Sequence, residues 1–184
     1  QDIELPNLKY SLPAYYIIMT AEASANLARF DGVRYGLRKD DANLLGDYEA
    51  TRAEGFGAEP RMRILLGTYV LSAGYHDAYY RQAAAVRESI RKEVANSWNE
   101  VDLIALPTTP SPAFKIGERM EDPLSMYLSD IFTVPANITG IPAISIPMGT
   151  VIRDGKNLPV GFQFMAPHFA ESRLFETGKN LEKM

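Results

Sequence analysis

The sequence predicts an α/β fold in which helices pack in layers against a sheet. Short apolar runs typical of buried strands, such as DLIAL at 102–106, alternate with longer stretches whose apolar residues recur every three or four positions. The chain has 184 residues, 46% of them hydrophobic, which is enough for one domain with a sizeable core. Strands interleaved with helices indicate a layered α/β arrangement, and the sequence shows no internal repeat.

The N-terminal half is predicted to hold one strand followed by helices. Alternating polar and apolar residues at 2–5 are typical of a half-buried or edge strand. Prolines open two of the predicted helices. In the longest helix, Glu88 and Lys92 have the spacing of a favourable ion pair. The predicted elements are a strand at 2–5, helices at 13–30, 47–54, 60–74 and 75–99, and an exposed polar loop at 38–46.

The C-terminal half is predicted to supply most of the sheet. The segment PTTPSP at 107–112 cannot be helical, so it should form an ordered loop. Two apolar strands flank a polar turn that contains Asp-Gly, which indicates a hairpin. The predicted elements are strands at 102–106, 143–147 and 160–165, a turn at 153–157, and a terminal helix at 170–182 that points Leu174, Phe175 and Leu181 inward.

One carboxylate, Asp130, stands out in the apolar stretch at 121–149. Asp122 is predicted to cap a short helix that begins at Pro123 and carries Asp130. After Pro135 the pattern changes to that of a buried strand. A carboxylate where a strand meets helices is a candidate site residue, although the pattern alone favours an Asp that caps locally or is solvated. The same helix should turn five apolar side chains into a core: Leu124, Tyr127, Leu128, Ile131 and Phe132.

The composition argues against several kinds of site. The sequence has no cysteine, which excludes disulfides and thiolate chemistry and agrees with a reducing compartment. A net charge of -4 and a pI near 5.3 argue against a nucleic-acid surface. No apolar run approaches the roughly 20 residues that span a bilayer. His76 and His168 lack the spacing of a metal site, and no convincing nucleophile with its base is present.

Four segments together resemble the C-terminal part of the amidase signature family. They are EASANLARFDGVRYG at 22–36, EGFGAEPRMRILLGTYVLSAGYHDAYY at 54–80, EDPLSMYLSDIFTVPANITGIPAISIPMG at 121–149, and LPVGFQFMAP at 158–167. The resemblance runs over essentially the whole chain. It implies that residues 1–184 are a single C-terminal portion of an α/β/α layered domain with a mixed central sheet.

The resemblance also implies where catalysis takes place. Members of this family cut amides with a serine nucleophile in a glycine- and serine-rich segment, a second serine on a cis peptide bond, and a lysine. This sequence has neither a Gly-Ser nor a Ser-Gly dipeptide. We therefore expect no catalytic residue in this chain, and we expect it to be a fragment that is inactive alone.

Within the family, the chain is most similar to the glutamine-hydrolysing subunits of tRNA-dependent amidotransferases. The resemblance implies that the complete subunit is cytoplasmic and releases ammonia from glutamine to amidate misacylated Glu-tRNA(Gln). Partner subunits B and C are implied. The first of these partners would hold the tRNA and use ATP and Mg²⁺, and this chain would carry no cofactor. Two alternatives remain open, a stand-alone amidase and a non-catalytic docking fragment.

Three residues are candidate ligands of glutamine, which carries an ammonium and a carboxylate on one carbon. Arg63, near the start of the predicted helix at 60–74, could bind the carboxylate through two charge-assisted hydrogen bonds. Asp130 is the matching anion for the ammonium. The resemblance gives both residues these roles and adds Tyr15 from the pair Tyr15–Tyr16. The alternative is that Arg63 is solvated and that the tyrosines pack in the core or at its boundary.

Overall fold

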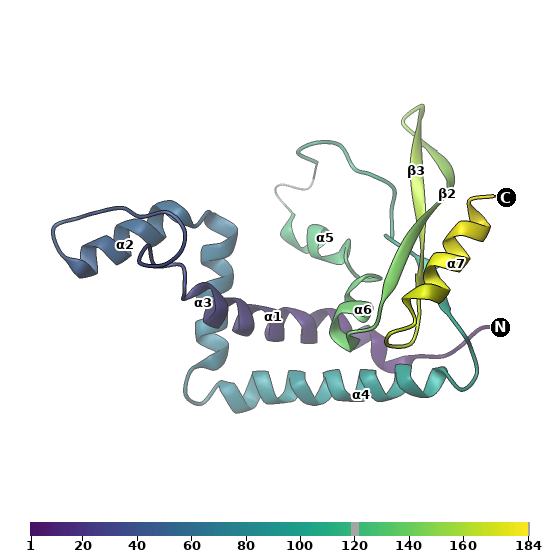
Figure 1. The fold of residues 1–184 in the computed structure, drawn as a ribbon, viewed down its shortest axis with the longest axis horizontal. Coiled ribbons are helices and arrows are strands. Elements are labelled where there is room, and N and C mark those ends of the chain that lie inside the picture. The colour runs from purple at the N-terminus through teal and green to yellow at the C-terminus, as the bar shows by residue number, and fades with distance from the viewer. Residues whose placement is uncertain (119–121, 184) are drawn as a thin grey trace. The chain divides into compact units, whose positions relative to one another are not determined.

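The computed structural model describes residues 1–118 and 122–183, which form two compact units (Figure 1). Unit 1 comprises Gln1–Leu12 and Val86–Met184, and unit 2 comprises Pro13–Ala85. Glu121, the first residue of the stretch around Asp130, lies outside the described residues. Every helix within the described ranges is too short or too polar to span a lipid bilayer.

Unit 1 contains a three-stranded sheet with the strand order β1-β3-β2. Its strands are β1 (Ile104–Pro107), β2 (Ala143–Arg153) and β3 (Lys156–Met165). Asp154 and Gly155 join β2 to β3 with φ angles of 51° and 74°, in the left-handed region that a two-residue hairpin turn requires. The predicted hairpin is confirmed, and its strands are longer than expected. Among the described strands the pairing is antiparallel rather than mixed.

Helices cover both faces of this sheet (Figure 1). They are α5 (Pro123–Leu128), α6 (Val134–Thr139) and α7 (Glu171–Leu181). Helix α7 packs on one face, where a Cβ added at Gly178 would lie 3.4 Å from Ile146 Cδ1. Side chains alternate along a strand, so Gln163, paired with Ser145, lies on the other face. There its Nε2 donates to the carbonyl oxygen of Phe132, just before α6, at 2.8 Å. Unit 1 is therefore layered α/β/α, as expected.

Helix α4 (Arg81–Ser97) supports α6 from Val86 onward. Ile90 and Val94 are buried, which the three-to-four-residue spacing predicted. Arg87 Nε donates to the carbonyl oxygen of Ile138, near the end of α6, at 2.9 Å. This bond satisfies one of the carbonyls that a helix end leaves free, so α4 holds α6 by its C-terminal turn.

The predicted strand at 2–5 is wrong. Residues 1–5 have no regular structure, and Pro6–Tyr10 forms a short 3₁₀ turn. The backbone N–H of Asn7 donates to the carboxylate of Glu93, with a nearest distance of 3.1 Å. A side chain 86 residues away thus fixes the segment that local alternation assigned to a sheet.

Unit 2 is built from helices that pack closely. They are α1 (Ser11–Leu27, with Pro13 onward in this unit), α2 (Leu44–Gly55), α3 (Ala58–Leu71) and the π-helical turn η2 (His76–Tyr80). A Cβ added at Gly67 would lie 1.9 Å from the carbonyl oxygen of Thr20, so α3 crosses α1 where only glycine fits. Ser24 Oγ and Thr68 Oγ1 share a hydrogen bond of 3.0 Å beside this crossing. The small residues of α1 predicted such close packing.

Three details differ from the predictions. The helix expected at 75–99 is divided, because a π turn precedes α4. Glu88 pairs with Arg91 at 3.6 Å instead of with Lys92. Phe175, expected to point inward, is 67% exposed, whereas Leu174 beside it is buried. Its neighbour in sequence takes the sheet-facing position, since adjacent helical residues point about 100° apart.

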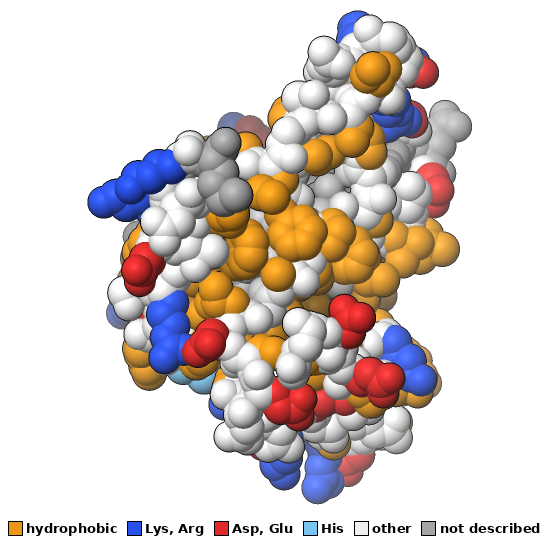
Figure 2. Space-filling view, turned by 90° about the vertical axis from the view of Figure 1, so that its right-hand side faces the viewer, with side chains coloured by type: hydrophobic (Ala, Val, Ile, Leu, Met, Phe, Trp, Pro, Cys, Tyr) orange, Lys and Arg blue, Asp and Glu red, His pale blue; other side chains and the backbone are white. Residues whose placement is uncertain are grey.

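Large apolar side chains remain on the surface of unit 1. Figure 2 shows hydrophobic side chains gathered on one face of the molecule. On α5 and just after it, Leu124, Leu128 and Ile131 are exposed, so the expectation that they enter a core is wrong for this chain. Contiguous exposed apolar surface is typical of a face that contacts more protein.

Candidate functional site

Asp130 lies in the turn between α5 and α6 rather than on a helix. Helix α5 begins as predicted, because Asp122 Oδ1 accepts a hydrogen bond from the backbone N–H of Ser125 at 3.1 Å. The helix ends at Leu128, two residues before Asp130. Asp130 is exposed, and within the described residues its carboxylate makes no hydrogen bond or ion pair. Its negative charge is therefore available to a ligand.

The turn that carries Asp130 is held firmly by its backbone. Thr133 Oγ1 donates to the carbonyl oxygen of Asp130 at 3.1 Å, and the backbone N–H of Val134 donates to the same oxygen at 2.9 Å. Gln163, only 4% exposed, holds the carbonyl of Phe132 from β3. Gly140 then ends α6 with φ 78°. The carboxylate is thus free while its backbone is fixed.

Arg63 lies in unit 2, on the second turn of α3. Its Nε is 2.9 Å from Glu59 Oε1, one helical turn earlier, and its Nη1 is 4.0 Å from Met19 Sδ on α1. Because α3 begins at Ala58 rather than Pro60, Arg63 is beyond the first turn, where the field of a helix N-terminus fades. The predicted contribution of the helix end is therefore smaller than expected.

Tyr15 lies on α1, one turn before Met19, and is half-buried. Its ring meets that of Tyr16 edge to face, with a centroid separation of 5.3 Å. Unit 2 therefore brings Arg63 to the helix that carries Tyr15, one turn away along that helix. The pairing of Arg63 with Asp130 joins residues of different units and stays a prediction.

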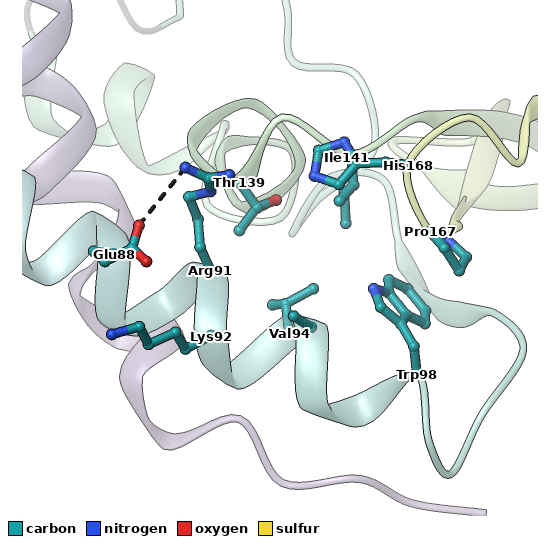
Figure 3. Close-up of a pocket in the computed structure, with 10 residues that line it drawn as sticks. Glu88, Arg91, Lys92, Val94, Trp98, Thr139, Ile141, Pro167 and His168 are labelled. Carbon is teal, nitrogen blue, oxygen red and sulfur yellow. Dashed lines mark ion pairs between the residues drawn. The ribbon is translucent and has the colours of Figure 1, made fainter.

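A cavity of about 420 Å³ in unit 1 was not anticipated from the sequence (Figure 3). Its residues come from α4 and from the segments at 139–141 and 167–168, which are far apart in the chain. They are Glu88, Arg91, Lys92, Val94, Ala95, Trp98, Thr139, Ile141, Pro167 and His168. The one signal available in the sequence was the single tryptophan, placed directly after an amphipathic helix. No group of three or more acidic or histidine side chains suited to a metal ion is found among the described residues.

Comparison with known proteins places these features in a family. The curated relatives include the A subunits of two glutamyl-tRNA(Gln) amidotransferases. That of Parvibaculum lavamentivorans is 52% identical over 183 residues and that of Acidobacterium capsulatum 55% over 183 residues. These matches cover 100% and 99% of this chain but 37% and 38% of the relatives. The chain thus spans little more than a third of their length.

Solved structures give the same picture. The glutamyl-tRNA(Gln) amidotransferase A subunit of Thermotoga maritima matches with a TM-score of 0.64 and 40% identity, over 94% of this chain and 32% of its own. A 6-aminohexanoate cyclic dimer hydrolase matches with a TM-score of 0.71 but 21% identity, over 100% of this chain and 37% of its own, so it shows the fold alone. The family model for amidases matches residues 1–175. The chain belongs to the amidase family.

Proposed function

We propose that this chain is the substrate-recognising C-terminal part of a glutaminase subunit of a tRNA-dependent amidotransferase. The observation that carries the proposal is identity of 52–55% along the whole chain to A subunits of glutamyl-tRNA(Gln) amidotransferases. The complete subunit would hydrolyse glutamine to glutamate and ammonia. The ammonia would serve to amidate misacylated Glu-tRNA(Gln).

The partners follow from the same proposal. The complete subunit would assemble in the cytoplasm with subunits B and C as a ligase, and tRNA would be bound mainly by the first of these two partners. ATP and Mg²⁺ would be used there, since this chain has a net charge of -4 and no glycine-rich phosphate loop. The exposed apolar side chains of α5 support contact with further protein.

In this proposal Arg63, Asp130 and Tyr15 recognise the amino-acid end of glutamine. Asp130 would bind the ammonium with a carboxylate that is exposed and needs to leave no partner. Arg63 would bind the carboxylate with the guanidinium nitrogens that Glu59 does not engage. Tyr15 would line the apolar side chain or donate its hydroxyl. The amide carbon would be left to catalytic groups outside this chain.

A stand-alone amidase is the second candidate, and the fold by itself favours neither. Structures that share the fold at 21–22% identity are those of an amidase and of a cyclic dimer hydrolase. The higher identity to the amidotransferase subunits favours the glutaminase. A pocket for a simple amide would also have no use for an arginine and an aspartate together.

The test uses the complete amidotransferase and measures glutamine hydrolysis in the variants Asp130→Asn and Arg63→Gln. Each loses one charge-assisted interaction of about 1.5–3 kcal/mol, so kcat/KM for glutamine should fall about 10- to 100-fold. Asp102→Asn and Arg61→Gln serve as matched controls, since both side chains are exposed in the same units as their counterparts. Unchanged kinetics in either site variant remove that residue from the pocket. A preference for acetamide over glutamine in the unmodified enzyme would favour the stand-alone amidase.

A further inference from the structure

We propose that the cavity in unit 1 is a second ligand site, separate from the glutamine residues, that binds a small aromatic carboxylate. Its volume of about 420 Å³ lies within the range of about 300–1,000 Å³ typical of small-molecule sites. Neither Asp130 nor any other predicted glutamine ligand lines it. The proposal therefore does not depend on the proposed glutaminase function.

The cavity is apolar at one end. Figure 3 shows Trp98 and Pro167 there, with Ile141 and His168 above Val94 of α4. Trp98 is half-buried, so one face of its indole is available to a ligand while the rest is packed. A flat aromatic body suits such a wall, because rings pack well against an indole in offset or edge-to-face geometry.

The other end carries positive charge. Arg91 rises from α4 toward Thr139, and its Nη1 is 3.6 Å from Glu88 Oε2, beyond hydrogen-bond distance. Glu88 is the single carboxylate among the lining residues, against the two cations Arg91 and Lys92. Lys92 has no ion pair within the described residues. An anionic group is therefore the complementary ligand, and a carboxylate matches the planar guanidinium of Arg91.

The turn that places His168 over the cavity is strained. The backbone N–H of Ala170 donates to the carbonyl oxygen of Pro167 at 3.1 Å, which closes a turn around His168 and Phe169. Phe169 has φ 62°, a left-handed conformation that costs a bulky residue free energy, and its side chain is 93% exposed. Its ring therefore offsets little of this cost by burial. The strain holds the imidazole of His168 where Figure 3 shows it, across the cavity from α4.

The experiment follows Trp98 directly in the full chain. The protein is labelled with 5-fluorotryptophan, and the ¹⁹F resonance of position 98 is assigned by its absence in Trp98→Phe. The chain contains one tryptophan. Benzoate and its neutral analogue benzamide are then titrated. We expect a saturable shift with benzoate and binding of benzamide at least about tenfold weaker, because benzamide lacks the charge that Arg91 would pair with.

Variants decide whether the cavity carries this preference. Arg91→Gln should weaken benzoate at least about tenfold, and Arg91→Lys should fall between it and the unmodified protein, since it keeps the charge but loses the fork. Arg81→Gln is the matched control, because Arg81 forms a similar exposed ion pair with Asp77 and does not line the cavity. Equal shifts with benzoate and benzamide, or benzoate binding unaffected by Arg91→Gln, would overturn the proposal.

Discussion

The two charged residues proposed to hold glutamine are prepared in opposite ways. In unit 1, Asp130 has a carboxylate without a partner among the described residues, on a backbone fixed by Thr133 and Gln163. In unit 2, Arg63 lies on a regular helix and its guanidinium is already engaged by Glu59. The anion is therefore free on a firmly held turn, whereas the cation is occupied on a helix whose position depends on α1.

This difference assigns each side of the pocket its own weakness. The Asp130 side should fail when the hydrogen bonds that hold its turn are removed. The Arg63 side should fail when α3 moves away from α1, and should improve when its competing partner is removed. Four substitutions test the contrast, in order of decreasing effect.

The largest effect is expected from Gly67→Ala in unit 2. The added Cβ would lie 1.9 Å from the carbonyl oxygen of Thr20 and 2.7 Å from Ser24 Cβ, so α3 must move away from α1. Overpacking of this kind should lower the free energy of unfolding by about 3 kcal/mol, the upper end of the usual range. Denaturant unfolding measures it, and kcat/KM for glutamine should fall because Arg63 moves with α3.

Gly55→Ala is the control for this prediction. The nearest atoms to a Cβ at Gly55 are 4.0 Å away, on Leu37. Its stability should stay within about 0.5 kcal/mol of the unmodified protein or rise slightly, since alanine favours a helix more than glycine. Equal stability of both variants would contradict the close crossing of α1 and α3.

Gln163→Leu tests the turn that carries Asp130. Leucine fills most of the volume but leaves the buried carbonyl of Phe132 without the donor that now lies 2.8 Å away. An unsatisfied buried carbonyl costs about 1–3 kcal/mol, so unfolding should become easier by about 2 kcal/mol. Thermal or denaturant unfolding checks this loss. Gln82→Leu, an exposed glutamine on α4, should change stability by less than about 0.5 kcal/mol.

In the same variant, the KM for glutamine should rise with little change in kcat, because a looser turn holds Asp130 less well. A variant that keeps its stability and its KM would show that Gln163 does not hold this turn.

Local chemistry made the hairpin and the α5 cap predictable. Asp154-Gly155 can adopt the left-handed angles of a tight turn, and Asp122 followed by Pro123 begins a helix wherever it occurs. Gln163 was beyond sequence reasoning, since its role depends on a carbonyl 31 residues away. The cavity was equally hidden, because Trp98 and His168 meet only in the folded unit.

The candidate site shows the same limit of local patterns. Asp130 was placed on a helix because the apolar spacing continued past Leu128, but the hydrogen bonds of Thr133 turn the chain before α6. Burial of Val134, Pro135 and the rest of α6 against unit 1 overrides that spacing. The charge of Asp130 and its neighbourhood could be predicted, while its backbone conformation could not.

A smaller and opposite effect is expected from Glu59→Gln. Exposed ion pairs one helical turn apart contribute about 0.3–0.5 kcal/mol, so freeing Arg63 should lower the KM for glutamine about twofold. Steady-state glutaminase kinetics at low salt measure this change. Asp77→Asn, which breaks the similar pair with Arg81, should leave KM unchanged. An increase in KM would instead mean that Glu59 orients Arg63 for binding.

The last prediction concerns Tyr69 on α3, and its effect should vanish at neutral pH. A hydrogen bond with Tyr75, followed by desolvation, raises the pKa of Tyr69 from its ordinary value near 10 to about 12. Above pH 10 the unfolded chain loses the tyrosine proton while the folded chain keeps it, so rising pH favours unfolding. The stability contributed by Tyr69 should be complete below pH 10 and disappear between pH 10 and about 12.

Denaturant unfolding at a series of alkaline pH values checks this in the unmodified protein and in Tyr69→Phe, which should lack that part of the loss. Tyr10→Phe is the matched control, because Tyr10 and Tyr69 are both 48% exposed and Tyr10 is outside the ring cluster of Tyr69, Tyr75 and Tyr79. If Tyr10→Phe removed as much of the alkaline loss as Tyr69→Phe, the loss would come from general tyrosine ionisation. The unit that carries Arg63 would then owe nothing to the Tyr69–Tyr75 hydrogen bond, and its stability would depend on the α1–α3 crossing instead.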